Sequence, residues 1–159
     1  MEKPIKELTI TRTFDAPRKL VWEAWTNPEL LRQWFGPRGV TNPICEVDAR
    51  KGGTIHIVME AGPELGPAKG MKWPMKGKFD EVVPYERFTF TAGALDDQQG
   101  ILLENRQTVT LEEMGDKTKM TLHVVVTMVT KNAGQAIAGM TAGFNQQTDK
   151  LGEFLMSKK

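Results

Sequence analysis

Residues that build the commonest catalytic and metal sites are scarce in this sequence. It contains one cysteine, Cys45, and two histidines, His56 and His123. A single cysteine excludes an intrachain disulfide, and no second histidine or cysteine stands at metal-ligand spacing from either histidine, so no zinc site is expected. The alternation around both histidines predicts that their rings point outward. Cys45 is interpreted as a small core thiol, because a nucleophile would need a base and a setting that favours the thiolate.

Long apolar runs, long basic runs and phosphate-binding motifs are also missing. No stretch of 18 apolar residues exists, and the opening Met1–Lys6 has no apolar segment of a signal peptide. The longest basic runs are Arg50-Lys51 and Lys158-Lys159, and 21 basic residues face 20 acidic ones. Neither a P-loop nor a GxGxxG motif is present. We therefore expect a cytoplasmic protein with no cofactor, no metal, no nucleic-acid partner and no membrane partner.

The most informative stretch is the last long one, Asn132–Leu155. At 159 residues the chain fits one domain, residues 1–159, and this stretch predicts one helix of about 24 residues, roughly 36 Å long. One face carries an apolar stripe on which Thr148 also lies: Ile137, Met140, Phe144, Leu151 and Leu155. Three glycines, Gly134, Gly139 and Gly143, weaken this helix by about 1 kcal/mol each relative to alanine.

Upstream of that helix the chain reads as one strand, two short helices and about six further strands. Glu7–Phe14 alternates as a strand, and Arg12 interrupts its apolar face, which places this charge at a sheet margin or beside a buried carboxylate. Pro17 suits the first position of a helix, and Asn27 suits the cap of a second one. From Cys45 to Met128 the pattern is that of antiparallel strands, with a hairpin turn at Lys51-Gly52-Gly53.

This order predicts an α+β fold in which a curved antiparallel sheet wraps the C-terminal helix, since no other element is long enough to cover the sheet. The strand faces are rich in methionine, and the helix carries glycines, which have no side chain, on or near its inner face. Both features favour an internal cavity between the two layers. The alternative is that the methionines are adaptable core filler. Five of them raise this question: Met59, Met75, Met120, Met128 and Met140.

Several separated motifs resemble one family. They are the run Ile10–Pro17, the pair Val21-Trp22, the run Ala24–Glu29, the run Trp34–Pro37, the segment Glu81–Arg87 and the closing Gly143–Leu151 segment. Together they are similar to the C-terminal domain of the activator of the ninety-kilodalton heat-shock chaperone's ATPase. That family lies within the superfamily of START, polyketide-cyclase and plant-allergen-like domains. The likeness covers essentially the whole chain, although the family more often has Trp where Phe144 stands.

The resemblance implies a helix-grip architecture, with an apolar cavity that in many members takes a hydrophobic ligand. Glu104 and Arg106 share one parity on the sixth strand and Gln107 the other, so one set is expected to face the helix and the other solvent. We assign the cavity to the following candidate residues: Trp25, Trp34, Ile57, Met59, Met75, Phe79, Phe90, Glu104, Arg106, Met140, Phe144 and Thr148.

Three functions follow as hypotheses. The first is the binding of a small hydrophobic or amphipathic ligand, such as a lipid, in that cavity. The second is a co-chaperone-like module with a heat-shock ATPase as partner and a place in the stress response. The third is a cyclase- or dehydratase-like enzyme, for which no catalytic residue can be named, because the acidic pairs Asp80-Glu81 and Asp96-Asp97 read as solvated. Monomer and homodimer both remain open, with Trp22, Trp73 or the loop Ala61–Gly70 as interface candidates.

Overall fold

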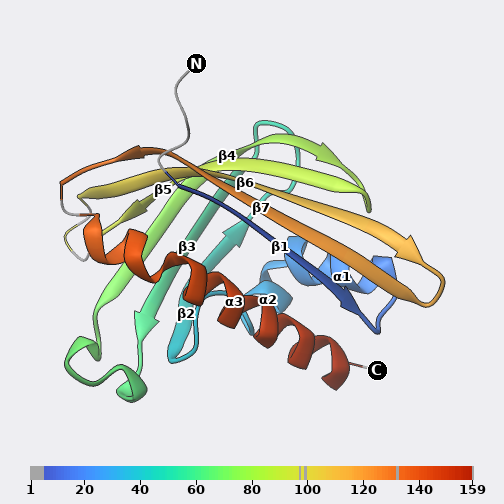
Figure 1. Cartoon of the computed structure of the whole chain (residues 1–159), viewed down its shortest axis with the longest axis horizontal. Coiled ribbons are helices and arrows are strands. Elements are labelled where there is room, and N and C mark those ends of the chain that lie inside the picture. The colour runs from blue at the N-terminus through green and yellow to red at the C-terminus, as the bar shows by residue number, and fades with distance from the viewer. Residues whose placement is uncertain (1–5, 97, 99, 132, 159) are drawn as a thin grey trace.

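The computed structural model of the chain describes residues 6–96, 98, 100–131 and 133–158, and it shows a curved antiparallel sheet with its helices on the concave face (Figure 1). The strands are β1 (Lys6–Phe14), β2 (Val40–Val47), β3 (Thr54–Ala61), β4 (Lys72–Val83), β5 (Arg87–Leu95), β6 (Ile101–Met114) and β7 (Lys117–Val129). The helices are α1 (Arg18–Thr26), α2 (Pro28–Leu31), the 3-10 helix η1 (Pro63–Ala68) and α3 (Gly134–Ser157). The predicted helix-grip α+β class is confirmed.

The strand order makes the two short helices a bridge across the sheet. The order is β1-β7-β6-β5-β4-β3-β2, so β1 and β2 follow each other in the chain but form opposite edges. α1 and α2 connect these edges below the concave face. From β2 to β7 each strand pairs with the next in antiparallel hairpins. The sheet is therefore continuous, and it presents one inner face that the helices must cover.

Local sequence signals explain where elements begin and turn. The side chain of Asn27 accepts a hydrogen bond from the Glu29 amide at 3.0 Å and caps α2, as predicted. Gly52 has a φ of 82° in the predicted turn between β2 and β3. Pro17 differs from the prediction. Its ψ of 151° is extended, so it precedes α1 as the cap residue and helical geometry starts at Arg18.

An aromatic cluster fills the end of the core beneath α1 and α2. The rings of Trp25 and Trp34 meet edge to face with centroids 4.8 Å apart, and Phe88 contacts Trp22, Trp25 and Phe79. The Trp25 indole donates to the Met120 sulfur at 3.3 Å. Trp22 is buried in this cluster, so it is not an exposed interface residue, contrary to one of the expectations above.

α3 lies across the concave face and follows β1 along the edge of the sheet (Figure 1). It ends two residues beyond the predicted Leu155, and the predicted start, Asn132, is outside the described residues. Thr148, Leu151 and Leu155 are buried on its inner side, as the stripe predicts. Within the described ranges, no helix is both long enough and apolar enough to cross a bilayer.

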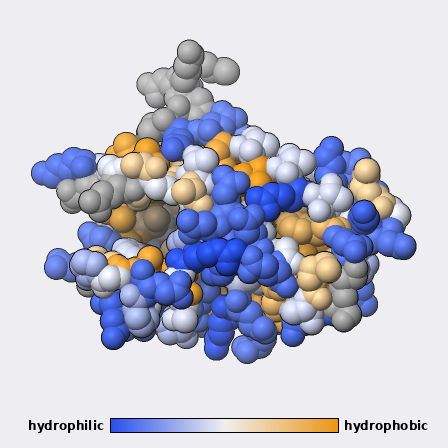
Figure 2. All heavy atoms as spheres, turned by 60° about the horizontal axis from the view of Figure 1, so that its bottom comes forward, coloured by the Kyte–Doolittle hydropathy of each residue, from blue (hydrophilic) through white to orange (hydrophobic). Residues whose placement is uncertain are grey.

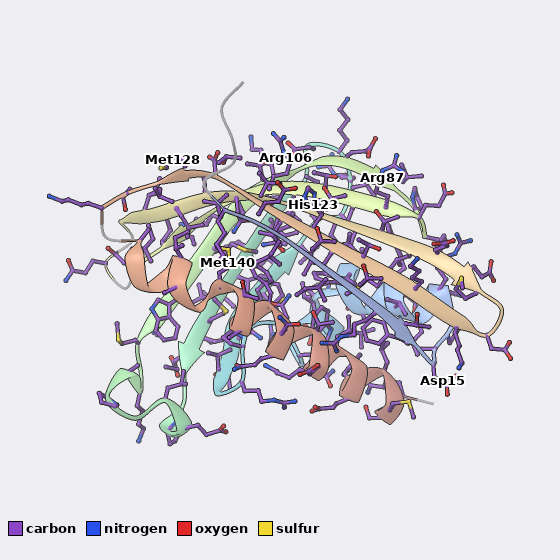
Figure 3. All side chains as sticks on the ribbon, viewed as in Figure 1. Asp15, Arg87, Arg106, His123, Met128 and Met140 are labelled. Carbon is purple, nitrogen blue, oxygen red and sulfur yellow. The ribbon has the colours of Figure 1, made fainter. Side chains whose placement is uncertain are left out.

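A β-bulge corrects one strand assignment. The alternation predicts Met128 on the inner face with Val124 and Val126, but the β6–β7 register shifts between Glu104 and Asn105. Glu104 consequently pairs with Met128, while Asn105 pairs with Val126. The shift leaves Met128 exposed, and Figure 3 shows it away from α3. Met128 therefore belongs neither to the core nor to a cavity.

The C-terminal half of α3 is expected to carry the contact between helix and sheet. Replacing the fully buried Leu151 by alanine should lower the free energy of unfolding by about 2–5 kcal/mol, because it removes apolar contacts and leaves a void. Met156→Ala, at an exposed position of the same helix, should change it by less than about 0.5 kcal/mol. Urea unfolding followed by circular dichroism measures both, and equal effects would contradict this view of α3.

Candidate ligand-binding site

The packing of α3 against the sheet is uneven along the helix. Its C-terminal half is buried, but towards the N-terminus the inner side chains of Ala136, Ile137 and Phe144 are only half-buried. The facing sheet residues Leu8 and Ala94 are half-buried as well, although they pack at the border of the core. Figure 2 shows a hollow with hydrophobic atoms inside it, on the side of the molecule where α3 begins. The two layers therefore close less completely at this end.

Two polar contacts at the sheet edge hold α3 in register with β1. The Lys6 ammonium donates to the Ile137 carbonyl at 3.0 Å, and Arg12 pairs with Asp149 at 2.6 Å. Lys6 to Arg12 spans about 20 Å of strand, and Ile137 to Asp149 spans about 18 Å of helix, so the two run side by side. Arg12 thus sits at the sheet margin, and its partner is a half-exposed carboxylate of α3 rather than a buried one.

This register places Met140 and Phe144 at the level of the middle of the inner sheet face. Leu8, one third of the way from Lys6 to Arg12, lies opposite Val124 on β7, and Val124 lies opposite Gln107 on β6. The point one third of the way along the helix segment from Ile137 to Asp149 lies between Met140 and Phe144. Met140 is buried, and Figure 3 shows it between α3 and the sheet.

At that level the inner face of β6 carries two buried amides. The Gln107 Nε2 atom donates to Asn105 Oδ1 at 3.3 Å, and Gln107 is only 1% exposed. The remaining Gln107 acceptor, Oε1, has no hydrogen-bond partner. On α3, buried Gln147 accepts from the Gly36 amide at 2.9 Å but leaves its own Nε2 donor unpaired. Unpaired buried polar atoms are unusual in native proteins, so these two atoms stand out in an otherwise apolar interior.

A polar clamp fastens the loop after α2 to the C-terminal half of α3. The Lys150 ammonium donates to the carbonyls of Gly36 and Pro37 at 3.1 and 3.2 Å. Burial, together with the nearby Arg38 charge, lowers the pKa of Lys150. Arg38 forms a two-point ion pair with Glu153, which raises the pKa of the guanidinium and lowers the pKa of the carboxyl. The clamp therefore ties this loop to α3 by two separate sets of contacts.

Two hollows open on the outer side of the clamp. One, of about 560 Å³, lies between η1, the Arg38–Thr41 segment and the last turns of α3. The other, of about 530 Å³, lies between the end of α2 and β2 and includes Asn42, whose buried Oδ1 lacks a partner. Neither hollow is lined by any of the twelve residues predicted from the sequence. They are surface features, and Gln107 lines neither of them.

The buried polar residues of the described chain are all neutral. They are Asn42, Asn105, Gln107, Thr118, Gln147 and Thr148. Both histidines lie on the outer face and pair with carboxylates, His56 with Glu46 and His123 with Glu7, as the alternation predicts. No cluster of potential metal ligands occurs among the described residues. Burial raises the pKa of the Cys45 thiol to about 11, which favours an inert core thiol over a nucleophile.

The predicted cavity residues divide into three groups. Trp25, Trp34, Phe79 and Phe90 belong to the tightly packed aromatic core, where ring contacts occupy their surfaces. The second group lies on the inner sheet face and on the inner side of α3; it comprises Ile57, Met59, Met75, Met140, Phe144 and Thr148. Met59 and Phe144 are half-buried, and the others are buried. The third group, Glu104 and Arg106, lies elsewhere.

The placement of Glu104 and Arg106 in a cavity is wrong. Glu104 accepts a hydrogen bond from Thr127 on the outer face, and Arg106 lies beside Thr91 and Asp80 there. Figure 3 shows Arg106 on the side of the sheet away from α3. Because β6 alternates, the inner set is the one that contains Gln107. The apolar residues Val109 and Leu111 share that parity, and extending the alternation to them would have identified Asn105 and Gln107 from sequence.

The glycines of α3 also differ from the expectation. Gly139 is exposed, and nothing lies within 4 Å of where its Cβ would be. A Cβ on Gly143 would meet only Pro37, at 3.9 Å. These positions therefore do not face the space between helix and sheet. The half-buried inner side chains of α3, rather than its glycines, mark where the helix packs less closely on the sheet.

A long C-terminal helix over the concave face of a curved antiparallel sheet, with two short helices joining the sheet edges, defines a helix-grip domain. The sequence pattern of one family within this class, described as activator of Hsp90 ATPase homolog 1-like protein, matches residues 15–156. The chain belongs to this family. In general terms, this family and fold support a domain of ligand-binding or co-chaperone type.

Several solved structures share this fold. A crystal structure of a protein from Nitrosomonas europaea is 26% identical over 96% of this chain and 95% of that one, with a TM-score of 0.76. An uncharacterised protein from Rhizobium leguminosarum (24% identity, 96% and 95% coverage, TM-score 0.81) shows the same fold. An AHSA1 protein from Silicibacter pomeroyi also shows it, with 20% identity over 97% of this chain and 100% of that one and a TM-score of 0.78. No curated protein matches the chain significantly.

A side chain at position 36, in the loop that the clamp fastens to α3, should lower the stability of the fold. Gly36 and Gly70 have φ angles of 88° and 86°, so alanine strains both backbones equally. Only at Gly36 would the new Cβ meet other atoms, the Met59 sulfur at 2.7 Å and Val40 Cγ2 at 2.8 Å. Gly36→Ala should therefore lower the free energy of unfolding by about 1–3 kcal/mol more than Gly70→Ala in urea titrations. Equal losses would show that the loop moves freely away from Met59.

The buried thiol of Cys45 should make the free energy of unfolding depend on pH in the alkaline range. Unfolded cysteine ionises near pH 8.5, and the folded pKa of Cys45 is raised to about 11. The stability that the protonated thiol contributes is complete below pH 8.5 and is lost as pH rises towards 11. The difference in unfolding free energy between wild type and Cys45→Ala should shrink by about 2 kcal/mol between pH 8.5 and 10.5. A pH-independent difference in urea unfolding would refute burial of this thiol.

Proposed function

We propose that the protein binds a small apolar or amphipathic molecule between the inner face of its sheet and the N-terminal half of α3. The observation that carries this proposal is the uneven burial along α3. From Thr148 onward its inner side chains are buried, whereas Ala136, Ile137 and Phe144 are half-buried above an apolar sheet face. Incomplete closure of two apolar layers leaves surface that a ligand can cover, at about 25 cal/mol per Å² of apolar area.

The residues around this space suit adaptable apolar binding. Met59 and Met75 project from the sheet and Met140 from the helix, and methionine side chains adjust to irregular shapes at little cost. Ala94, opposite Met75 on β5, leaves room because its side chain is small. The combination supports recognition by shape and hydrophobicity, with lipids among the ligands that fit the proposal.

Two other functions have less support from the structure. The family description supports a co-chaperone-like role, for which the test is stimulation of a purified heat-shock ATPase by excess protein. A cyclase- or dehydratase-like enzyme would need an acid or base inside the cavity. The buried polar side chains of the described residues are amides and hydroxyls, which supports binding rather than proton transfer.

The proposal also covers the domain organisation, the cellular location and the oligomeric state of the protein. The whole chain is taken to act as one domain, because the sheet and α3 use elements from both ends of the sequence. A cytoplasmic location is supported by the single cysteine, which is free and buried. Monomer and homodimer both fit, and sedimentation distinguishes them.

The binding proposal is tested with the neutral fluorescent probe N-phenyl-1-naphthylamine, whose emission rises in apolar surroundings. Wild type should bind it, and Ala94→Phe should weaken binding at least 10-fold by filling the space beside Met75. Gly139→Leu provides the matched control, because that position faces solvent and should leave the affinity unchanged.

Thermal unfolding of both variants establishes that they remain folded. Native mass spectrometry of the purified protein should in addition detect a bound small molecule. Absence of probe binding to wild type would refute the proposal. Equal affinities of wild type and folded Ala94→Phe would move the site away from the space beneath α3.

A further inference from the structure

The buried amide pair on β6 gives the interior a specific hydrogen-bonding feature. Gln107 is 1% exposed, and its Nε2 donor is used by Asn105. Its Oε1 acceptor remains without a partner. A buried carbonyl oxygen with no hydrogen bond destabilises the folded state, and such atoms persist where function requires them or where a further molecule completes them.

The unpaired acceptor lies at the level of the N-terminal half of α3, where some inner side chains of the helix are only half-buried. Gln107 stands opposite Phe90 on β5 and Val124 on β7, in the middle of the inner face. The register between α3 and β1 puts Met140 and half-buried Phe144 at the same level. A molecule entering between helix and sheet would therefore reach Gln107 with apolar side chains on either side of it.

The surroundings of this acceptor exclude a charged ligand group. The buried polar residues among those described carry no charge, and the nearest level of α3 is apolar. Lys6 and Arg12, which share the inner side of β1, lie at the sheet edge and already bind Ile137 and Asp149. An ionised carboxylate beside Gln107 would lack a counter-ion among the buried residues described, which makes its burial unfavourable.

We propose that the ligand is an uncharged amphiphile whose hydroxyl or N–H group donates a hydrogen bond to Gln107 Oε1, while its hydrocarbon part lies along the apolar inner face. The inference rests on the proposed binding function and adds to it the chemical class of the ligand. Recognition combines one neutral hydrogen bond with apolar contact. A fatty acid in its ionised form is disfavoured, and the corresponding alcohol or amide is favoured.

The test compares two isomers that differ in the donor. Decan-1-ol has an O–H group, and methyl nonyl ether has the same atoms without one. Both are measured by displacement of N-phenyl-1-naphthylamine from wild type, Gln107→Met and Arg106→Met. Gln107→Met should reduce the preference for alcohol over ether about 10-fold, because methionine fills a similar volume but lacks the amide acceptor. Comparing the ratio cancels any difference in hydrophobicity between the isomers.

Arg106→Met is the matched control, since it changes the neighbouring residue on the outer face and should leave the preference at the wild-type value. Gln107→Leu replaces Gln107→Met if the latter does not fold. An unchanged preference in a folded Gln107 variant would overturn the inference and leave the binding proposal standing, with an enclosed water as the partner of Oε1.

Decanoate at pH 8 supplies the third arm of the experiment. It should bind at least 10-fold more weakly than decan-1-ol, because its charge cannot be compensated near Gln107. Binding as tight as that of the alcohol would overturn the inference. If the probe, the alcohol and the ether all fail to bind wild type, the binding function itself is refuted, so the two failures are distinguishable.

Discussion

Everything in this structure depends on burying one face of a continuous seven-stranded sheet. Because β1 and β2 form opposite edges, the chain must cross the concave face between them, and α1 with α2 makes that crossing. The aromatic residues of this crossing pack one end of the interior. The other end is left to α3, a single helix, which seals the sheet only along part of its length. An incompletely covered region follows from covering a wide curved sheet with so few helices.

Charged side chains hold α3 in place from the edges of the interior, and none of them is buried inside it. Arg12 with Asp149, and Arg38 with Glu153, join the helix to β1 on one side and to the loop after α2 on the other. These pairs stay at margins that water reaches, where an ion pair avoids most of the desolvation cost that a buried one incurs. The polar side chains that do lie inside, such as Gln107 and Thr148, are neutral amides and hydroxyls. The interior is thus suited to uncharged molecules.

Much of the fold, and about half of the candidate site, could be predicted from sequence. Strand alternation and the stripe of α3 identified every major element, and Met140 and Thr148 face inward as predicted. Glu104 and Arg106 were misplaced because the polar segment around them shows its inner side only through the parity of Val109 and Leu111 further along β6. Met128 was misplaced because a bulge shifts the alternation, and no residue of the pattern signals that bulge.

The sequence by itself determined the order of elements, the amphipathic character of α3, the scarcity of catalytic residue types and the family resemblance, because these depend on local spacing and residue identity. Tertiary structure alone decided that the aromatic rings of Trp25 and Trp34 fill one end of the core, that α3 closes tightly only at its C-terminal half, and that Gln107 keeps an unpaired acceptor inside. Those properties arise from contacts between segments distant in sequence, where packing rather than periodicity sets which atoms meet.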